Sequence, residues 1–163
     1  MSALIATFLY VGRLPLAPGT FGSLAALPFG YLVHRFAGFP GLAVATLALF
    51  ALGWWATAAE TRGRDDHDPG EIVIDEVVGQ WIALWPLSFG LWHAGVDPAL
   101  FPYPGWIGAF LMFRLFDILK PWPVSWADRK STAFGVMFDD VLAGLMAAIV
   151  VMVAAAIAHG WLI

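Results

Sequence analysis

The stretch GVMFDDVLAGLMAAIVVMVAAAIAHG, residues 135–160, decides the fold class of this chain. Two adjacent carboxylates, Asp139 and Asp140, stand at the head of about twenty apolar residues, and a helix needs about that length to cross a hydrocarbon core of about 30 Å. Backbone N–H and C=O groups find no water inside a bilayer, so such a segment must be helical. The stretch therefore predicts a membrane-spanning helix over residues 138–158, with two acidic side chains at its start.

The composition of the whole chain is typical of a membrane protein. Of its 163 residues, 61% are hydrophobic and 12% are charged, whereas soluble domains carry about 25% charged residues. The length fits a single domain over residues 1–163. A net charge of −4 argues against a nucleic-acid partner, which favours a basic surface. The sequence has no cysteine, which excludes disulfides, thiolate nucleophiles and zinc–thiolate sites.

Four further apolar runs precede the last one. The five runs cover residues 21–37, 41–59, 72–92, 104–119 and 138–158. This pattern predicts an all-α integral membrane protein, a bundle of about four to five helices. The first run is interrupted by Pro28, so it is expected either to cross the membrane or to re-enter it from one side.

Basic residues distribute unevenly when the five runs are laid alternately across a membrane. One face receives most of the basic loop residues: Arg13, Arg62, Arg64, Lys120, Arg129 and Lys130. The other face receives only Arg35. Loops rich in Lys and Arg tend to stay in the cytoplasm, so the first face is predicted to be cytoplasmic.

Carboxylates gather at the same face. The alternation places there the acidic side chains Asp75, Glu76, Asp117, Asp139 and Asp140. Ionisable residues at membrane depth are costly and usually face a bundle interior or an aqueous cavity, and five carboxylates repel one another unless cations compensate. Magnesium takes oxygen ligands and is commonly held by carboxylates together with substrate phosphate. We therefore predict a magnesium site at the cytoplasmic end of the bundle.

Helix geometry suggests how these residues divide their roles. Successive helical residues are about 100° apart, so Asp75 and Glu76 are expected to point in different directions, with only one of them at the metal. Arg114 and Asp117 are three residues apart and share a helix face, and Lys120 follows at the helix end. This spacing presents cation, anion and cation along one edge, an arrangement that suits a phosphate beside a carboxylate-bound metal.

Structural roles stay open for the same residues. Asp139 and Asp140 could cap a helix, because Asp favours the N-cap and the first turn. Asp75 and Glu76 lie several residues inside an apolar run, which makes capping a poorer explanation for them. Arg114 and Asp117 could form a purely structural ion pair inside the membrane.

Two loop segments carry weaker signals. In LAPGTFGSLAALP, residues 16–28, a glycine-bearing turn leads into a helix, and backbone N–H groups at a helix start favour phosphate. Thr20 and Ser23 are candidate phosphate-binding residues there, although capping of that helix is the favoured interpretation. RDDHDPG, residues 64–70, is interpreted as a polar loop, with His67 solvated rather than bound to a metal; metal binding by the carboxylates of this loop is the weaker alternative.

Three other classes of function compete. A cation transporter would also use membrane carboxylates, but a relay needs charges through the midplane, and here they gather at one face. Another metal-dependent lipid-headgroup enzyme, a CDP-alcohol transferase, would need a D-G-x-x-A-R signature that the chain lacks. A non-catalytic scaffold would leave the cluster of carboxylates unexplained.

Four blocks of sequence together resemble a known family. APGTFGSLAALP, HDPGEIVIDEVVGQWIAL, FRLFDILKPWPVSWADR and GVMFDDVLAG occur in the order and approximate spacing of bacterial phosphatidylglycerophosphatase A, over about residues 12–146. The resemblance implies a multi-pass enzyme of the bacterial inner membrane with its active site at the cytoplasmic face. It implies hydrolysis of the terminal phosphomonoester of phosphatidylglycerophosphate in phospholipid biosynthesis, with Mg²⁺ as the cofactor. Membrane lipid is then the partner, and no obligatory protein partner is expected.

The resemblance also implies which residues form the site. The catalytic set would be Asp75, Glu76, Asp117, Asp139 and Asp140. The metal ligands would be Asp75, Glu76, Asp139 and Asp140, and Arg114 and Lys120 would bind the phosphate. One departure is visible, because the family often has Gly-Gly where this chain has Ala133-Phe134. Whether water or a carboxylate attacks phosphorus stays open.

Overall fold

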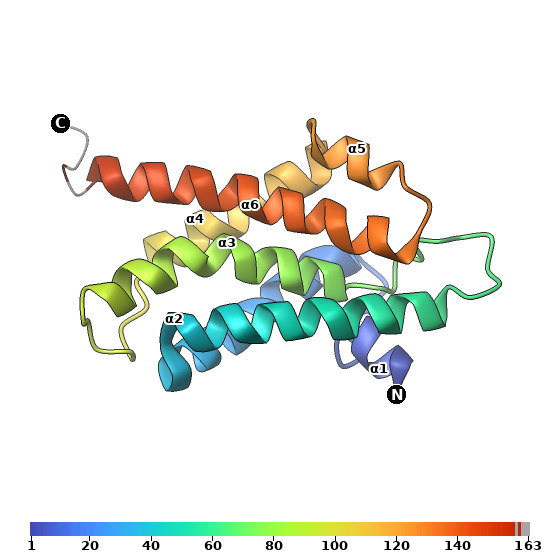
Figure 1. Ribbon diagram of the computed structural model, residues 1–163, viewed down its shortest axis with the longest axis horizontal. Helices are drawn as coiled ribbons and strands as arrows, with labels where there is room; N and C mark the ends of the chain where they lie inside the picture. The colour runs from blue at the N-terminus through green and yellow to red at the C-terminus, as the bar shows by residue number, and fades with distance from the viewer. Residues whose placement is uncertain (159, 161–163) are drawn as a thin grey trace.

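The chain folds into a bundle of helices. The computed structural model describes residues 1–158 and residue 160, and within them every regular element is helical (Figure 1). The elements are α1 (Ser2–Ala6), the 3₁₀ helix η1 (Val11–Arg13), α2 (Pro18–Glu60), α3 (Ile74–His93), α4 (Tyr103–Leu119), α5 (Val124–Asp128) and α6 (Ala133–Ala158). The predicted all-α class is therefore confirmed.

The long element α2 consists of two helices joined at Gly38. The backbone of Gly38 has φ 62° and ψ −164°, a conformation that residues with a Cβ rarely adopt. The chain reverses there, and the blue and teal halves of α2 run side by side in opposite directions (Figure 1). With α2 counted as two, the described part of the chain has five long helical segments, as the apolar runs predicted. Pro28 lies inside the first half without interrupting it.

Two of the helices are long and apolar enough to cross a membrane. They are α2 and α6, and only 17% of the most apolar window of each is buried inside the protein. On α6, Ile149, Met152 and Ile157 each expose more than half of their surface. A row of exposed aliphatic side chains is unfavourable in water but is the expected surface of a helix that faces lipid.

Helix α3 forms the centre of the bundle and packs against α2, α4 and α6. The backbones of α3 and α6 lie against each other, since a Cβ added to Gly144 would overlap the carbonyl oxygen of Gly79. Small residues at such a crossing let two helix backbones come together in a membrane, where no hydrophobic force drives the helices together. On the same crossing, a Cβ on Gly79 would lie 2.6 Å from the carbonyl oxygen of Asp140. The glycine contact thereby brings Asp140 next to the start of α3.

Candidate active site

The two acidic pairs occupy different helical positions from those expected. Helix α3 begins at Ile74, so Asp75 and Glu76 lie in its first turn. Helix α6 begins at Ala133, which places Asp139 and Asp140 well inside it. The helix-capping alternative for Asp139 and Asp140 is therefore wrong. The apolar run had suggested a later start, although Thr132 directly before the helix is a residue type that favours the N-cap, and its Oγ1 accepts the N–H of Gly135 at 3.1 Å.

Three carboxylates converge where α3 meets α6. Asp75, Glu76 and Asp140 each offer one oxygen, and these oxygens all lie within 4.8 Å of one another. Asp75 and Asp140 are buried, and Glu76 is half-buried. The expectation that Asp75 and Glu76 point at different centres is wrong. The 100° separation fixes only where each Cα–Cβ bond leaves the helix, and the longer Glu76 side chain can still bring its carboxylate back to Asp75.

Asp139 faces a different partner from its neighbour in sequence. Lys120 Nζ donates a hydrogen bond to Asp139 Oδ2 at 2.9 Å and a second one to Asp128 Oδ1. The other oxygen, Asp139 Oδ1, accepts the backbone N–H of Asp140 at 3.0 Å. Of the four predicted metal ligands, three are thus brought together, and Asp139 lies beside them in an ion pair.

Lys120 terminates α4 and is held in its charged form. Its partial burial opposes the charge, but the hydrogen bonds to Asp128 and Asp139 outweigh this effect and raise the pKa of Lys120 above its ordinary value. The lysine also has a positive φ of 44° at the C-cap of α4. It therefore ends the helix and joins α5 to α6 through two carboxylates.

Arg114 connects α4 to the start of α2. Its guanidinium lies 2.5 Å from Asp117 Oδ2 and donates a hydrogen bond to Ser23 Oγ at 3.4 Å. Ser23 Oγ in turn donates to the carbonyl of Gly19 at 2.9 Å. The residue before α2 is Ala17, and no side chain caps this helix, so the capping interpretation of Thr20 and Ser23 is wrong. Thr20 lies in the first turn, and its role in phosphate binding stays a prediction.

The first turn of α2 covers the carboxylate cluster. A Cβ added to Gly19 would overlap Glu76 Oε1 and would lie 3.4 Å from Arg114 Nη1. The carboxylate of Glu76 also faces the charges of Asp140, Asp117 and Arg114. Two polar atoms here, Glu76 Oε2 and Arg114 Nε, are buried without a hydrogen-bond partner among the described residues. An anionic oxygen and a cationic N–H group thus remain available for a ligand.

The loop between α2 and α3 folds over the same end of the bundle. A polar hollow of about 290 Å³ lies between this loop and α6, and its lining includes His67, Asp68, Asp128 and Asp139. Asp68 is exposed as a residue, yet loss of solvent around its carboxyl raises its pKa, and the charge of Lys120 opposes the rise. The loop was interpreted as a polar, solvated segment, and residues 62–68 are indeed exposed; the loop also forms one wall of the hollow beside Asp139.

Two residues near the cluster had not been singled out from the sequence. Asp128, on α5, shares Lys120 with Asp139, and its position in the block FRLFDILKPWPVSWADR was an available signal. Gln80 is fully buried, and neither atom of its amide has a partner among the described residues. It lies one helical turn beyond Glu76, and its signal was a single polar amide inside VVGQWIALW.

Comparison with known proteins gives a consistent result. The family model described as Phosphatidylglycerophosphatase A matches residues 4–155. A protein of Escherichia coli with that name is 35% identical over 139 residues, covering 84% of this chain and 73% of the relative. One of Haemophilus influenzae with the same name is 39% identical over 137 residues, covering 83% and 77%.

A third relative carries a different name. The protein of Bacteroides thetaiotaomicron named "Putative phosphatidylinositol-3-phosphatase" is 36% identical over 159 residues, covering 94% of this chain and 93% of the relative. No solved structure matches the chain. All three printed names denote a phosphatase that acts on a phospholipid.

Proposed function

The chain belongs to the phosphatidylglycerophosphatase A family, and from this premise we propose that it hydrolyses phosphatidylglycerophosphate. Water is consumed, the terminal P–O bond of the headgroup breaks, and phosphatidylglycerol and phosphate are released. The observation that carries the proposal is the convergence of Asp75, Glu76 and Asp140 beside the unpaired N–H of Arg114. This pairing of anionic and cationic groups suits a phosphomonoester better than a transported cation, which needs no arginine.

Magnesium is the proposed cofactor, and the donor set supports it. All three converging groups are carboxylates, the hard oxygen donors that Mg²⁺ prefers. Their mutual repulsion calls for a cation, and Glu76 Oε2 is buried without a partner. Asp75, Glu76 and Asp140 would hold the ion. When bound, it would act as a Lewis acid toward the phosphoryl oxygens.

This proposed ligand set is narrower than the set that the sequence suggested. Asp139 Oδ2 is occupied by Lys120, so we assign Asp139 to the wall of the site rather than to the metal. Its carboxylate fixes the lysine that joins α4 to α6. The same contact occupies the ammonium group of Lys120, so we do not assign Lys120 as the principal phosphate ligand.

Arg114 takes that role in our proposal. A guanidinium presents several N–H donors in a fixed plane and suits phosphate geometry. Asp117 and Ser23 fix its orientation through contacts of 2.5 and 3.4 Å. Preorganised donors of this kind stabilise charge that develops on the phosphoryl group without having to reorganise during the reaction.

The second candidate substrate is phosphatidylinositol 3-phosphate. It is favoured by the third relative, which aligns with more of this chain than the other two do. Both substrates carry a phosphomonoester on a membrane lipid, so the same carboxylate and arginine groups would serve. Only a direct comparison of the two lipids separates them.

The test is phosphate release by the purified protein in detergent. Each lipid is supplied with Mg²⁺, with a chelator, and with Mg²⁺ restored after chelation, and the Asp140→Asn variant is measured in parallel. We expect phosphatidylglycerophosphate to be the better substrate, with release that requires the metal and is lost in the variant. Absence of release from both lipids by a folded protein would contradict the proposal, and preference for the inositol lipid would favour the second candidate.

We further propose that the protein lies in the bacterial inner membrane with this site at the cytoplasmic face. Support comes from the two apolar helices α2 and α6 and from the bacterial relatives. The basic loop residues, which gather at the end of the bundle that carries the carboxylate cluster, support the orientation. The substrate headgroup would then meet the site at the level of the cytoplasmic leaflet.

A further inference from the structure

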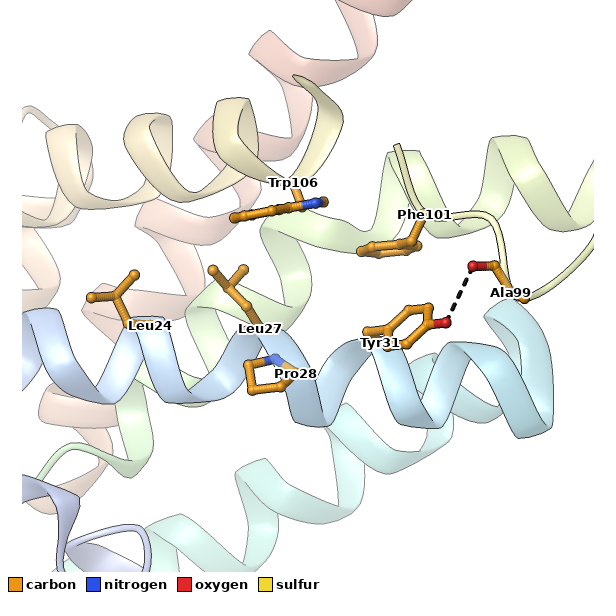
Figure 2. A pocket seen from close by; sticks show the side chains of 7 residues that line it. All are labelled: Leu24, Leu27, Pro28, Tyr31, Ala99, Phe101 and Trp106. Carbon is orange, nitrogen blue, oxygen red and sulfur yellow. Dashed lines mark hydrogen bonds between the residues drawn. The ribbon is translucent and has the colours of Figure 1, made fainter. Parts of the chain in front are cut away.

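An apolar groove runs along the bundle between the first half of α2 and the start of α4. It encloses about 550 Å³. Figure 2 shows its walls, with leucine, proline and tyrosine side chains of α2 facing two aromatic rings from the other side. Its lining includes Leu24, Leu27, Tyr31, Phe101 and Trp106. Leu24 is 41% exposed, so the groove lies at the surface of the protein.

One end of the groove adjoins the candidate active site. Ser23, which accepts the hydrogen bond of Arg114, directly precedes Leu24 in α2. On the opposite wall, Trp106 lies about two helical turns before Arg114 in α4. The two helices therefore run in opposite directions along the groove and meet through Ser23 and Arg114 at its polar end.

The other end of the groove is closed by polar contacts. The hydroxyl of Tyr31 donates to the carbonyl of Ala99 at 3.2 Å, a contact drawn in Figure 2. Arg35 Nη1 donates to the same hydroxyl at 3.0 Å, and the rings of Tyr31 and Phe101 have centroids 5.6 Å apart. The groove thus extends from Leu24, next to Ser23, at one end to a tyrosine–backbone contact at the other.

The length of the groove fits one leaflet. Eight residues separate Ser23 from Tyr31, which at 1.5 Å per helical residue is about 12 Å. Half of a hydrocarbon core of about 30 Å is about 15 Å. A chain of methylene groups that starts beside Ser23 and lies between Leu24 and Trp106 would therefore have about 12 Å of groove along which to lie.

We propose that this groove binds one acyl chain of the phospholipid substrate, an inference that rests on the proposed function. The lipid source is the substrate itself rather than the surrounding bilayer, because the groove begins at Leu24, directly after Ser23, and Ser23 contacts the Arg114 that would bind the phosphate. Lipid tails are as apolar as the groove, so entering it gives little transfer free energy. The groove acts by orientation: it fixes the distance between chain and headgroup, and misplacement by about 1 Å can lower a rate about 100-fold.

Two substitutions probe the two ends of the groove. Leu24→Trp fills the end beside the active site, and Ala99→Trp fills the far end, where Ala99 is exposed and contributes its backbone to the Tyr31 contact. The matched control is Leu47→Trp, on the second half of α2, where the leucine is 63% exposed and lies outside the groove lining. Each variant is assayed on phosphatidylglycerophosphate with long acyl chains and with chains of four carbons, in the same detergent.

The expected result depends on chain length. Ala99→Trp should raise KM for the long-chain lipid at least about fivefold and leave the short-chain lipid unchanged. Leu24→Trp should lower kcat/KM for both lipids by about tenfold or more, because it displaces the part of the chain next to the headgroup. Leu47→Trp should change neither. Equal losses on both lipids by Ala99→Trp, or an equal effect of Leu47→Trp, would overturn the groove assignment.

A binding measurement separates this inference from the proposed function. The probe is phosphatidylglycerophosphate with a photoactivatable group near the end of one acyl chain, cross-linked to the wild-type protein and mapped by mass spectrometry. We expect labels near Tyr31, Phe101 and Trp106, in excess over those left by phosphatidylcholine with the same chain. Labels spread evenly over exposed residues such as Leu47 and Met152 refute the groove whether or not phosphate is released. Labels in the groove without phosphate release would instead contradict only the proposed reaction.

Discussion

The backbone of Gly144 on α6 lies directly against that of Gly79 on α3. The contact is so close that a Cβ placed on Gly144 would lie 3.0 Å from the Cα of Gly79 and would overlap its carbonyl oxygen. This contact lies one helical turn from the carboxylate pair of α3 and one turn beyond Asp140 on α6. The distance between the two halves of the proposed metal site is therefore set by two residues that have no side chain.

Replacing Gly144 by alanine should separate α3 from α6. Overpacking a tight contact typically costs about 1–3 kcal/mol, and the carboxylates of Asp75 and Asp140 would move apart by the same shift. We expect a lower midpoint of thermal unfolding in detergent and a lower affinity for Mg²⁺. Gly108→Ala is the matched control, since a Cβ on Gly108 of α4 meets nothing within 4 Å. If both substitutions are equally tolerated, the glycine contact does not set the site geometry.

Asp139 and Asp140 should differ in their effect on metal binding although they are adjacent. Asp140→Asn removes one of the three converging carboxylates, and we expect affinity for Mn²⁺, a spectroscopic substitute for Mg²⁺, to fall at least about tenfold. Asp139→Asn weakens the contact with Lys120 instead, so metal affinity should stay within about threefold of wild type. Electron paramagnetic resonance titration of free Mn²⁺ measures both. Equal losses would place Asp139 among the ligands.

Lys120 should stabilise the folded protein at neutral and mildly alkaline pH, where the lysine and its two carboxylate partners are charged. Hydrogen bonds to Asp128 and Asp139 raise its folded-state pKa above an unfolded value of about 10.4. Stability from a raised pKa is fully present below the unfolded value and is lost only as pH rises through the folded value. Lys120→Met should therefore lower the unfolding free energy by about 1–3 kcal/mol, the cost of leaving a charged partner unpaired. Chemical denaturation should give the same loss at pH 8 and at pH 9, where the carboxylate partners and the lysine are all charged; a loss that varies between these two pH values would contradict this assignment.

The hydropathy pattern predicted the helices well because a bilayer imposes simple rules. Apolar length determines which segments can span it, and backbone groups must be satisfied within the segment. The run 72–92 became α3, Ile74–His93, and the run 104–119 became α4, Tyr103–Leu119. The start of α6 was misplaced, because the acidic pair Asp139 and Asp140 was taken as the boundary of the apolar run, whereas the apolar segment 133–138 before this pair is already helical.

The grouping of site residues was predictable, but their pairing was not. Alternation across a membrane brings Asp75, Glu76 and Asp140 to one end of the bundle whatever their contacts. The rotation of each helix about its axis decides which carboxylates meet, and that rotation depends on the Gly79–Gly144 crossing, a contact between residues far apart in sequence. The exclusion of Asp139 from the cluster follows from the same geometry.

Arg114→Lys should be much less active than wild type although the charge is kept. Lysine is a point charge on a flexible stem and cannot hold the planar contacts that Arg114 makes with Asp117 and Ser23. Loss of one preorganised donor typically lowers kcat by about 10²–10³, and we expect a fall in that range. Inhibition by inorganic phosphate should weaken in parallel. Ser23→Ala, which removes the 3.4 Å contact with Arg114 and the local hydrogen bond to Gly19 but keeps the guanidinium and its contact with Asp117, is the graded comparison and should lose far less activity. A fully active Arg114→Lys variant would remove Arg114 from phosphate binding.

The orientation in the membrane can be tested with single cysteines, because the chain has none of its own. Ser131 precedes α6 at the carboxylate end of the bundle, and Ala94 follows α3 at the opposite end; both are exposed. Since basic loops are retained in the cytoplasm, a membrane-impermeant maleimide added to intact spheroplasts should label Ala94→Cys. It should label Ser131→Cys only after the membrane is opened. The reverse pattern would place the carboxylate cluster on the outer side, where a lipid made in the cytoplasmic leaflet would have to cross the bilayer before it met Arg114.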